Sequence, residues 1–252
     1  MANQLAGKVA VITGAARGLG RAFALGYAAE GADIVAVDVT DPSATKAAAE
    51  KFGVRALALT VDISSEEQTL RMAQETLKAF GKIDILMNNA AVYALKPFDQ
   101  LTFADWKKLM SVNVDGTFLC TKAVAPHMRQ QKYGRIINIS SGTFWAGTAG
   151  LTHYVTSKGA VIGFTRAAAA EFGNDGVTVN CIAPGLTQTE GMKLIGPEEV
   201  QEMMWEQIIA MQAIKRRETP QDLVGAAVFF ASDASSFITG QTLCVDGALV
   251  KH

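Results

Sequence analysis

The stretch Val9–Gly20, Val-Ala-Val-Ile-Thr-Gly-Ala-Ala-Arg-Gly-Leu-Gly, predicts the architecture of the whole chain. Its apolar first half is typical of a strand buried on both faces, and its glycine-rich second half leads into a segment with helical spacing. Glycines let the backbone approach a pyrophosphate, and a helix N-terminus presents free N–H groups. The spacing Gly14, Gly18, Gly20 differs from the G-x-G-x-x-G fingerprint. The stretch indicates either a dinucleotide-binding turn or a turn needed only for tight packing.

The same alternation of a short apolar run and a longer helical run continues along the chain. The predicted strands are Val9–Thr13, Asp33–Asp38, Ala56–Ile63, Ile83–Asn88, Arg135–Ser140, Val177–Ile182 and Thr242–Val245. The predicted helices include Gly20–Glu30, Glu66–Phe80, Phe103–Met128 and Ser157–Phe172. Strands without polar alternation indicate a parallel sheet, and the strand–helix order predicts a doubly wound α/β fold with helices on both faces. No repeat or linker divides the chain, so we expect a single domain over residues 1–252.

The composition excludes several classes of protein. A formal net charge of −1 and 49% hydrophobic residues argue against intrinsic disorder and against general nucleic-acid binding. The three cysteines, Cys120, Cys181 and Cys244, are odd in number and widely spaced, as in proteins of a reducing compartment. With neither a signal-peptide pattern nor a long apolar run, the sequence predicts a cytoplasmic protein without nucleic-acid or membrane partners.

Asp38, at the end of the second predicted strand, favours NAD as the cofactor. A carboxylate there can accept hydrogen bonds from both ribose hydroxyls of NAD and would repel the 2′-phosphate of NADP. Arg17, inside the glycine-rich turn, favours NADP because a cation can reach a 2′-phosphate. We give Asp38 more weight, since a buried like-charge contact costs more than a solvated arginine gains. The alternative is that Asp38 only begins a turn.

Polar residues also end two further strands. Asp62 and the pair Asn88–Asn89 come directly after apolar runs. Because ligands of such sheets bind beyond the carboxyl ends of the strands, these residues point to the same ligand. Asp62 is suited to the adenine amino group, and the small residues after Asn89 leave room for a ribose. Turn capping is the alternative for each of them.

A serine, a tyrosine and a lysine make up the candidate catalytic set. Ser141 follows a buried strand, and Tyr154 and Lys158 are spaced so that they share one helix face. Oxidising an alcohol needs a base, and a free tyrosine titrates near pH ~10, which is too high. We expect the lysine ammonium, helped by a positive nicotinamide ring, to stabilise the phenolate. Ser141 would then orient the substrate oxygen. A surface tyrosine beside a solvated lysine is the alternative.

The sequence predicts no metal site. Its three histidines, His127, His153 and His252, form no zinc-ligand pattern with the cysteines.

Together these motifs resemble the classical short-chain dehydrogenase/reductase family over essentially the whole chain. The residues that carry the resemblance are Thr13–Gly20, Asn88–Ala91, Asn113, Ser141, Tyr154, Lys158, Pro184–Gly185 and the ending Ile238–Gly247. The resemblance implies a Rossmann-type sheet of about seven strands, usually in a homotetramer. It also implies that Asn113 extends the catalytic set through a bound water. Ala91 departs from the family, which usually has glycine there.

The resemblance completes the expected cofactor site. Thr187 and Thr189, after Pro184–Gly185, match positions that hold the nicotinamide carboxamide. The full expected set is Gly14, Arg17, Gly18, Leu19, Gly20, Asp38, Asp62, Ile63, Asn89, Tyr154, Lys158, Pro184, Gly185, Thr187 and Thr189.

The substrate is expected to meet an aromatic pocket beneath a lid formed by residues 186–219. The expected lining residues are Tyr93, Thr143, Phe144, Trp145, His153, Met192 and Trp205. For most apolar residues of the lid, ordinary helix packing is the stronger alternative. Such a pocket favours an apolar or ring-bearing alcohol or ketone.

Finer motifs resemble two subgroups of the family, 1-phenylethanol dehydrogenases and pyridoxal 4-dehydrogenases. The motifs are Thr143–Thr148, Ile162–Arg166 and Val245–His252. The sequence therefore predicts an NAD-dependent oxidoreductase that acts on a secondary alcohol or ketone. The alternatives are pyridoxal-type hemiacetal oxidation, an NADPH-dependent 3-oxoacyl-thioester reductase, and a non-catalytic dinucleotide-sensing scaffold.

Overall fold

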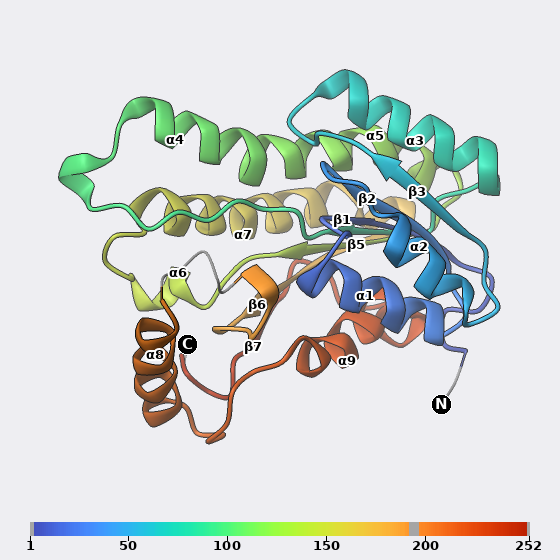
Figure 1. Cartoon of the computed structure of the whole chain (residues 1–252). Coiled ribbons are helices and arrows are strands. Elements are labelled where there is room, and N and C mark those ends of the chain that lie inside the picture. Colours follow the sequence, from blue (N-terminus) through green and yellow to red (C-terminus); the bar gives the residue numbers. More distant parts are fainter. Residues whose placement is uncertain (1–2, 192–196, 251–252) are drawn as a thin grey trace.

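The structure, a computed structural model, describes residues 3–191 and 197–250. A seven-stranded sheet in the order β3-β2-β1-β4-β5-β6-β7 runs through it (Figure 1). Every neighbouring pair of strands is parallel. The strands are β1 (Val9–Thr13), β2 (Asp33–Asp38), β3 (Ala56–Thr60), β4 (Ile85–Asn88), β5 (Gly134–Ile139), β6 (Val177–Pro184) and β7 (Thr242–Val245). The predicted Rossmann-type sheet is confirmed.

Helices cover both faces of this sheet (Figure 1). The α-helices are α1 (Gly18–Ala29), α2 (Ser43–Glu50), α3 (Glu66–Phe80), α4 (Phe103–Met110), α5 (Gly116–Gln130), α6 (Thr143–Ala146), α7 (Thr152–Phe172), α8 (Glu198–Met211) and α9 (Pro220–Ala231). Short helical turns are η1 (Phe98–Gln100), η2 (Ser111–Asp115), η3 (Gly173–Asp175) and η5 (Asp233–Ser235). Helices α1 and α9 pack on one face of the sheet, and α3, α5 and α7 pack on the other.

Strand β1 shows why the strands lack polar alternation. Ala10 and Ile12 belong to the core under α1 and α9, whereas Val9 and Val11 belong to the core under α3, α5 and α7. All four side chains are at most 1% exposed. Fully burying an aliphatic side chain contributes roughly 1.5–3 kcal/mol, so both faces of the strand favour apolar residues.

The third strand is shorter than the predicted Ala56–Ile63, because a turn begins after Thr60. The Asp62 carboxylate accepts hydrogen bonds from the backbone N–H and the hydroxyl of Ser64. The backbone N–H of Asp62 donates to the Gln68 side chain. These local bonds replace the sheet pairing, as aspartate side chains commonly do in turns.

Two predicted helices also differ from the observed ones. The helix predicted at Ser157–Phe172 begins earlier, at Thr152, so that Tyr154 lies inside α7. The helix predicted over Phe103–Met128 is three elements, because the π-turn η2 separates α4 from α5. Within the described residues, no helix combines the length and apolar character needed to cross a membrane.

Candidate active site

The first turn has no room for a side chain at Gly14 or Gly20. A Cβ on Gly20 would lie 2.0 Å from the Gly14 carbonyl oxygen, and one on Gly14 would lie 2.8 Å from the Cα of Ala90. Gly14 and Gly18 also have positive φ angles of 67° and 56°. Helix α1 begins at Gly18, so its free N–H groups face the same space. This turn fits the pyrophosphate of a dinucleotide, whose oxygens accept from such N–H groups.

The ends of β1 and β4 are fastened together beside this turn. The Thr13 hydroxyl accepts from the backbone N–H groups of Asn89 and Ala90, each at 3.0 Å. The side-chain amide of Asn89 donates to the Thr13 carbonyl oxygen at 2.9 Å. We call residues Thr13–Gly20 and Asn88–Ala91 together the glycine cradle. Its shape is set by hydrogen bonds within the protein itself.

Asp38 and Arg17, the two residues expected to influence the choice between NAD and NADP, differ in their surroundings. The Asp38 carboxylate accepts from the backbone N–H groups of Ala16 and Thr40, both at 3.0 Å, and is thereby held beside the glycine cradle. Arg17 is exposed. After the next strand, one carboxylate oxygen of Asp62 accepts a hydrogen bond from the Ser64 backbone N–H. Ile63 is buried against Gly116. The arrangement places a fixed negative charge where the ribose of a bound dinucleotide would lie.

Ser141, Tyr154 and Lys158 come together at the carboxyl end of β5. The Lys158 ammonium lies 5.6 Å from the centre of the Tyr154 ring and donates to the Ile139 carbonyl oxygen at 2.8 Å. The Ser141 hydroxyl accepts from the Thr143 hydroxyl at 2.9 Å. Ser141 and Lys158 are 7% and 3% exposed. A serine two residues after β5 and two residues of α7 therefore lie in one small region.

The pKa of Tyr154 in the protein alone is higher than expected. Burial raises the pKa of the Tyr154 hydroxyl to about 12, and the hydrogen bond with Ser141 opposes this only in part. Burial also lowers the pKa of Lys158 to about 8, because its ammonium has lost water. The protein alone thus keeps the phenol neutral. A positively charged nicotinamide ring is the further charge that would favour the phenolate.

Asn113 joins three parts of the chain. Its side chain accepts from the Val92 backbone N–H at 2.8 Å, donates to the Val92 carbonyl oxygen at 3.0 Å, and donates to the Ser157 hydroxyl at 3.1 Å. Asn113 is 1% exposed and sits in the π-turn η2. The helix predicted over Phe103–Met128 therefore changes register at Asn113, and the π-turn directs the Asn113 amide toward α7.

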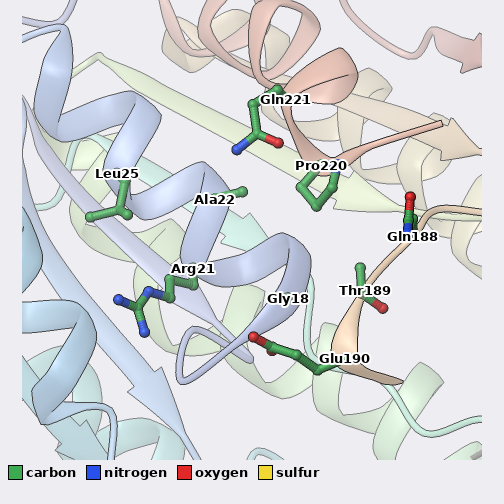
Figure 2. A pocket seen from close by; sticks show the side chains of 9 residues that line it. All are labelled: Gly18, Arg21, Ala22, Leu25, Gln188, Thr189, Glu190, Pro220 and Gln221. Carbon is green, nitrogen blue, oxygen red and sulfur yellow. The ribbon is translucent and has the colours of Figure 1, made fainter. Parts of the chain in front are cut away.

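The segment after β6 reaches back over the first turn. A Cβ on Gly18 would lie 3.7 Å from the Cβ of Thr189, which is ordinary contact. A cavity of about 300 Å³ opens behind this contact, between the start of α1, residues 188–190 and the start of α9 (Figure 2). Thr187 does not leave its hydroxyl free, because that hydroxyl donates to the Glu218 carboxylate. Sequence reasoning missed Glu218, which lies in a polar run without a motif.

Aromatic side chains form one side of the cluster. Tyr93 meets Tyr154 edge to face, with ring centres 5.2 Å apart, and Phe144 meets Trp145 in the same way at 5.1 Å. The Phe144 ring lies over Gly159 of α7, where a Cβ would come within 2.8 Å of it. We call Tyr93, Phe144 and Trp145 the aromatic wall. Phe144 is 40% exposed, so the wall has surface available for contact.

Two other predicted substrate residues, His153 and Trp205, lie elsewhere. His153 is 1% exposed, and the charges that act on it belong to Lys96 and Asp105 rather than to the catalytic cluster. Trp205 is 2% exposed in α8, where its ring packs under the Arg217 guanidinium. Met192 lies outside the described residues. Among residues 3–191 and 197–250, no cluster of histidine, cysteine or acidic side chains is arranged to hold a metal ion.

Comparison with known proteins identifies the family. Residues 14–249 match the family profile described as enoyl-(acyl carrier protein) reductase. The chain is 41% identical to (2S)-[(R)-hydroxy(phenyl)methyl]succinyl-CoA dehydrogenase subunit BbsD of Thauera aromatica, over 95% of each chain. It is 35% identical to 3-oxoacyl-[acyl-carrier-protein] reductase of Synechocystis, over 98% of each chain. A Beutenbergia cavernae protein, solved with NADP at low occupancy, superposes with a TM-score of 0.90 and 36% identity over 97% of each chain.

The chain belongs to the classical short-chain dehydrogenase/reductase family. It is an oxidoreductase of that family, whose members bind NAD(P). Family membership alone does not fix the substrate or the choice between NAD and NADP, which depend on the residues of the site.

Proposed function

We propose that the protein transfers hydride between NAD and a secondary alcohol or ketone that bears an aromatic or cyclic group. The observation that carries this proposal is the meeting of Ser141, Tyr154 and Lys158 beside the aromatic wall. A dinucleotide would be held by the glycine cradle, by Asp38 and by residues 184–189, and when bound it would supply the hydride acceptor.

The chain's own residues account for the proton. In the oxidising direction the Tyr154 oxygen would accept the proton of the alcohol O–H, and a dinucleotide bound at the glycine cradle would supply the hydride acceptor. Ser141 donates to the substrate oxygen and fixes its orientation. Lys158, protonated below its pKa of about 8, favours the phenolate across the 5.6 Å to the ring. Asn113 positions α7 through Ser157. In the reducing direction Tyr154 returns the proton.

Two observations support a ring-bearing substrate. Tyr93 of the aromatic wall meets the Tyr154 ring edge to face, and Phe144 of the same wall is 40% exposed. Aromatic rings favour edge-to-face or offset contact with other rings. The relative from Thauera aromatica has a phenyl-bearing alcohol in its name. A phenyl carbinol such as 1-phenylethanol is therefore our first choice of substrate.

The choice of NAD rests on Asp38. Its carboxylate is held in place by two backbone N–H groups, so it cannot easily turn away from a 2′-phosphate. Initial rates with NAD⁺ and NADP⁺ test this, using 1-phenylethanol, pyridoxal, cyclohexanol, a sugar alcohol and a 3-hydroxyacyl thioester. We expect NAD⁺ to be preferred and the ring-bearing alcohols to be oxidised fastest. If no ring-bearing compound reacts, the substrate class is wrong.

A second candidate is an NADPH-dependent 3-oxoacyl-thioester reductase. It is favoured by the similarity to the Synechocystis reductase and by exposed Arg17 at the glycine cradle. A strong preference for NADPH together with reduction of a 3-oxoacyl thioester would establish this candidate instead. Oxidation of pyridoxal alone would assign the protein to the hemiacetal-oxidising alternative. Absence of turnover with intact dinucleotide binding would favour the non-catalytic scaffold.

We also propose a homotetramer. Phe118 of α5 is 48% exposed and meets Phe164 of α7 edge to face, at 6.5 Å between ring centres. An exposed ring on α5 that packs against a half-buried ring on α7 suits contact with a second copy. Light scattering after size exclusion gives the mass in solution, and a monomeric mass would contradict the proposal.

A cytoplasmic location is proposed on the state of the thiols. Cys120 and Cys181 are buried free thiols. Free thiols are typical of a reducing compartment. Cell fractionation tests the location.

A further inference from the structure

Glu218, between α8 and α9, is a buried carboxyl group bonded to the segment that follows β6. It is 6% exposed. One carboxylate oxygen accepts from the Thr187 hydroxyl at 2.5 Å, and the other accepts from the Gly185 backbone N–H at 3.1 Å. The Glu218 backbone carbonyl accepts from the Gln188 N–H at 2.8 Å. Glu218 thus bonds to three residues of the segment that is proposed to face the nicotinamide, Gly185, Thr187 and Gln188.

Gly185 is shaped for this contact. A Cβ at position 185 would lie 3.0 Å from the Glu218 carboxylate and 3.0 Å from the Cβ of Asp246. Real Cβ atoms rarely come so close to their neighbours. The glycine therefore lets the carboxylate reach the backbone N–H, and the two residues form a matched pair.

The local helix does not account for this glutamate. Thr219 and Asp222 already form the capping box that begins α9. Arg216 is paired with Asp222, and none of the ion pairs among residues 3–191 and 197–250 includes Glu218. A carboxyl group taken out of water without a cation is costly unless hydrogen bonds replace the lost hydration. The hydrogen bonds that Glu218 receives come from Gly185 and Thr187.

We propose that Glu218 is a positioning residue that holds Gly185–Thr187 in the conformation that receives the nicotinamide carboxamide. This inference rests on the proposed function, since it takes residues 185–189 as part of the cofactor site. It predicts that losing the carboxylate weakens cofactor binding more than it slows the chemical step. The reason is that the segment must then be ordered by the cofactor itself.

The charges around Glu218 should make cofactor affinity depend on pH. Burial raises the pKa of Glu218 to about 7, Asp246 and Asp222 act in the same direction, and the bonds from Thr187 and Gly185 oppose them. Arg216 is the facing cation. The ionised carboxylate accepts from both donors, whereas protonation turns one oxygen into a donor. Cofactor affinity should therefore weaken as the pH falls through the neutral range.

The experiment is a fluorescence titration with NADH, without substrate, at several pH values on either side of neutrality. We expect Glu218→Ala to raise the Kd about tenfold and to raise KM for the cofactor more than it lowers kcat. Glu218→Gln should raise the Kd about threefold and remove the pH dependence near neutrality. The matched control is Glu206→Gln, which removes the same charge from an exposed position of α8 and should leave the Kd and its pH profile unchanged.

The results separate the two proposals. If the wild-type protein binds no nicotinamide dinucleotide, the proposed function fails and this inference fails with it. If the wild-type protein binds NADH and Glu218→Gln keeps both its Kd and its pH profile, this inference alone is overturned. Glu218→Gln nearly preserves the volume of the side chain, so the test stands even if Glu218→Ala does not fold.

Discussion

The glycine cradle and the aromatic wall are built in different ways. In the cradle, Gly14 and Gly20 lie close to backbone atoms, and Thr13 and Asn89 are joined by hydrogen bonds. In the wall, side-chain rings meet edge to face, and Phe144 is 40% exposed. A backbone contact leaves no room for a change, whereas a ring can be exchanged for another ring or an aliphatic group.

This difference explains how one architecture accommodates several substrates. The two relatives described above differ in the substrate that they name, a phenyl-bearing succinyl-CoA derivative and an acyl-carrier-protein thioester. Each aligns over at least 95% of this chain. The common part is the fold that holds the cofactor, and the variable part is a surface of side chains at the end of the sheet.

The strongest test of the comparison is at Tyr154, whose ring meets Tyr93 of the wall. Tyr154→Phe keeps the edge-to-face contact with Tyr93 but removes the hydroxyl. We expect kcat to fall about 10³-fold, within the range for loss of a general acid–base group, and the Kd for NADH to stay within about twofold. Steady-state rates and NADH titration measure the two effects. Turnover at the wild-type level in this variant would refute the proposed chemistry.

The rigidity of the cradle is tested at Gly20. Gly20→Ala places a methyl group where the Gly14 carbonyl oxygen lies, so the turn must open. We expect a loss of stability of about 1–3 kcal/mol and a Kd for NADH raised about 100-fold. Thermal unfolding and NADH titration check both. Gly163→Ala in α7 is the control, because a Cβ there meets nothing within 4 Å. Equal behaviour of the two variants would show that the cradle is not rigid.

Asn113 lies between the cradle and the wall and should show an intermediate effect. Asn113→Ala leaves the backbone N–H and carbonyl of Val92 without their partner and frees the Ser157 hydroxyl. Because an unsatisfied buried polar group costs about 1–3 kcal/mol, we expect a lower melting temperature and a kcat reduced about tenfold. Wild-type kcat in this variant would show that Asn113 does not position α7.

The smallest effect is expected at the wall. Phe144→Ala removes an exposed ring, so KM for an aryl carbinol should rise about three- to tenfold while KM for the cofactor stays constant. Phe103→Ala on α4, where the ring is 72% exposed, is the control and should change neither. If Phe144→Ala changes aliphatic and aryl alcohols equally, the ring does not select the substrate.

The sequence by itself determined the sheet, the glycine turn and the catalytic spacing. Strands such as Val9–Thr13 are apolar on both faces because both faces are covered. The spacing of Tyr154 and Lys158 places both on one face of α7 because the helical period is fixed. These features depend on neighbours along the chain or on a repeated pattern.

Tertiary structure decided what depends on residues distant in sequence. The π-turn at Asn113 arises from bonds to Val92 and Ser157, and Glu218 gains its role only because Thr187 lies beside it. His153 faces Lys96 and Asp105 although it precedes Tyr154 directly. The pKa of Tyr154 also depends on tertiary structure, because burial of the hydroxyl raises it. Side-chain direction and loss of water are set by packing, which spacing along a chain does not encode.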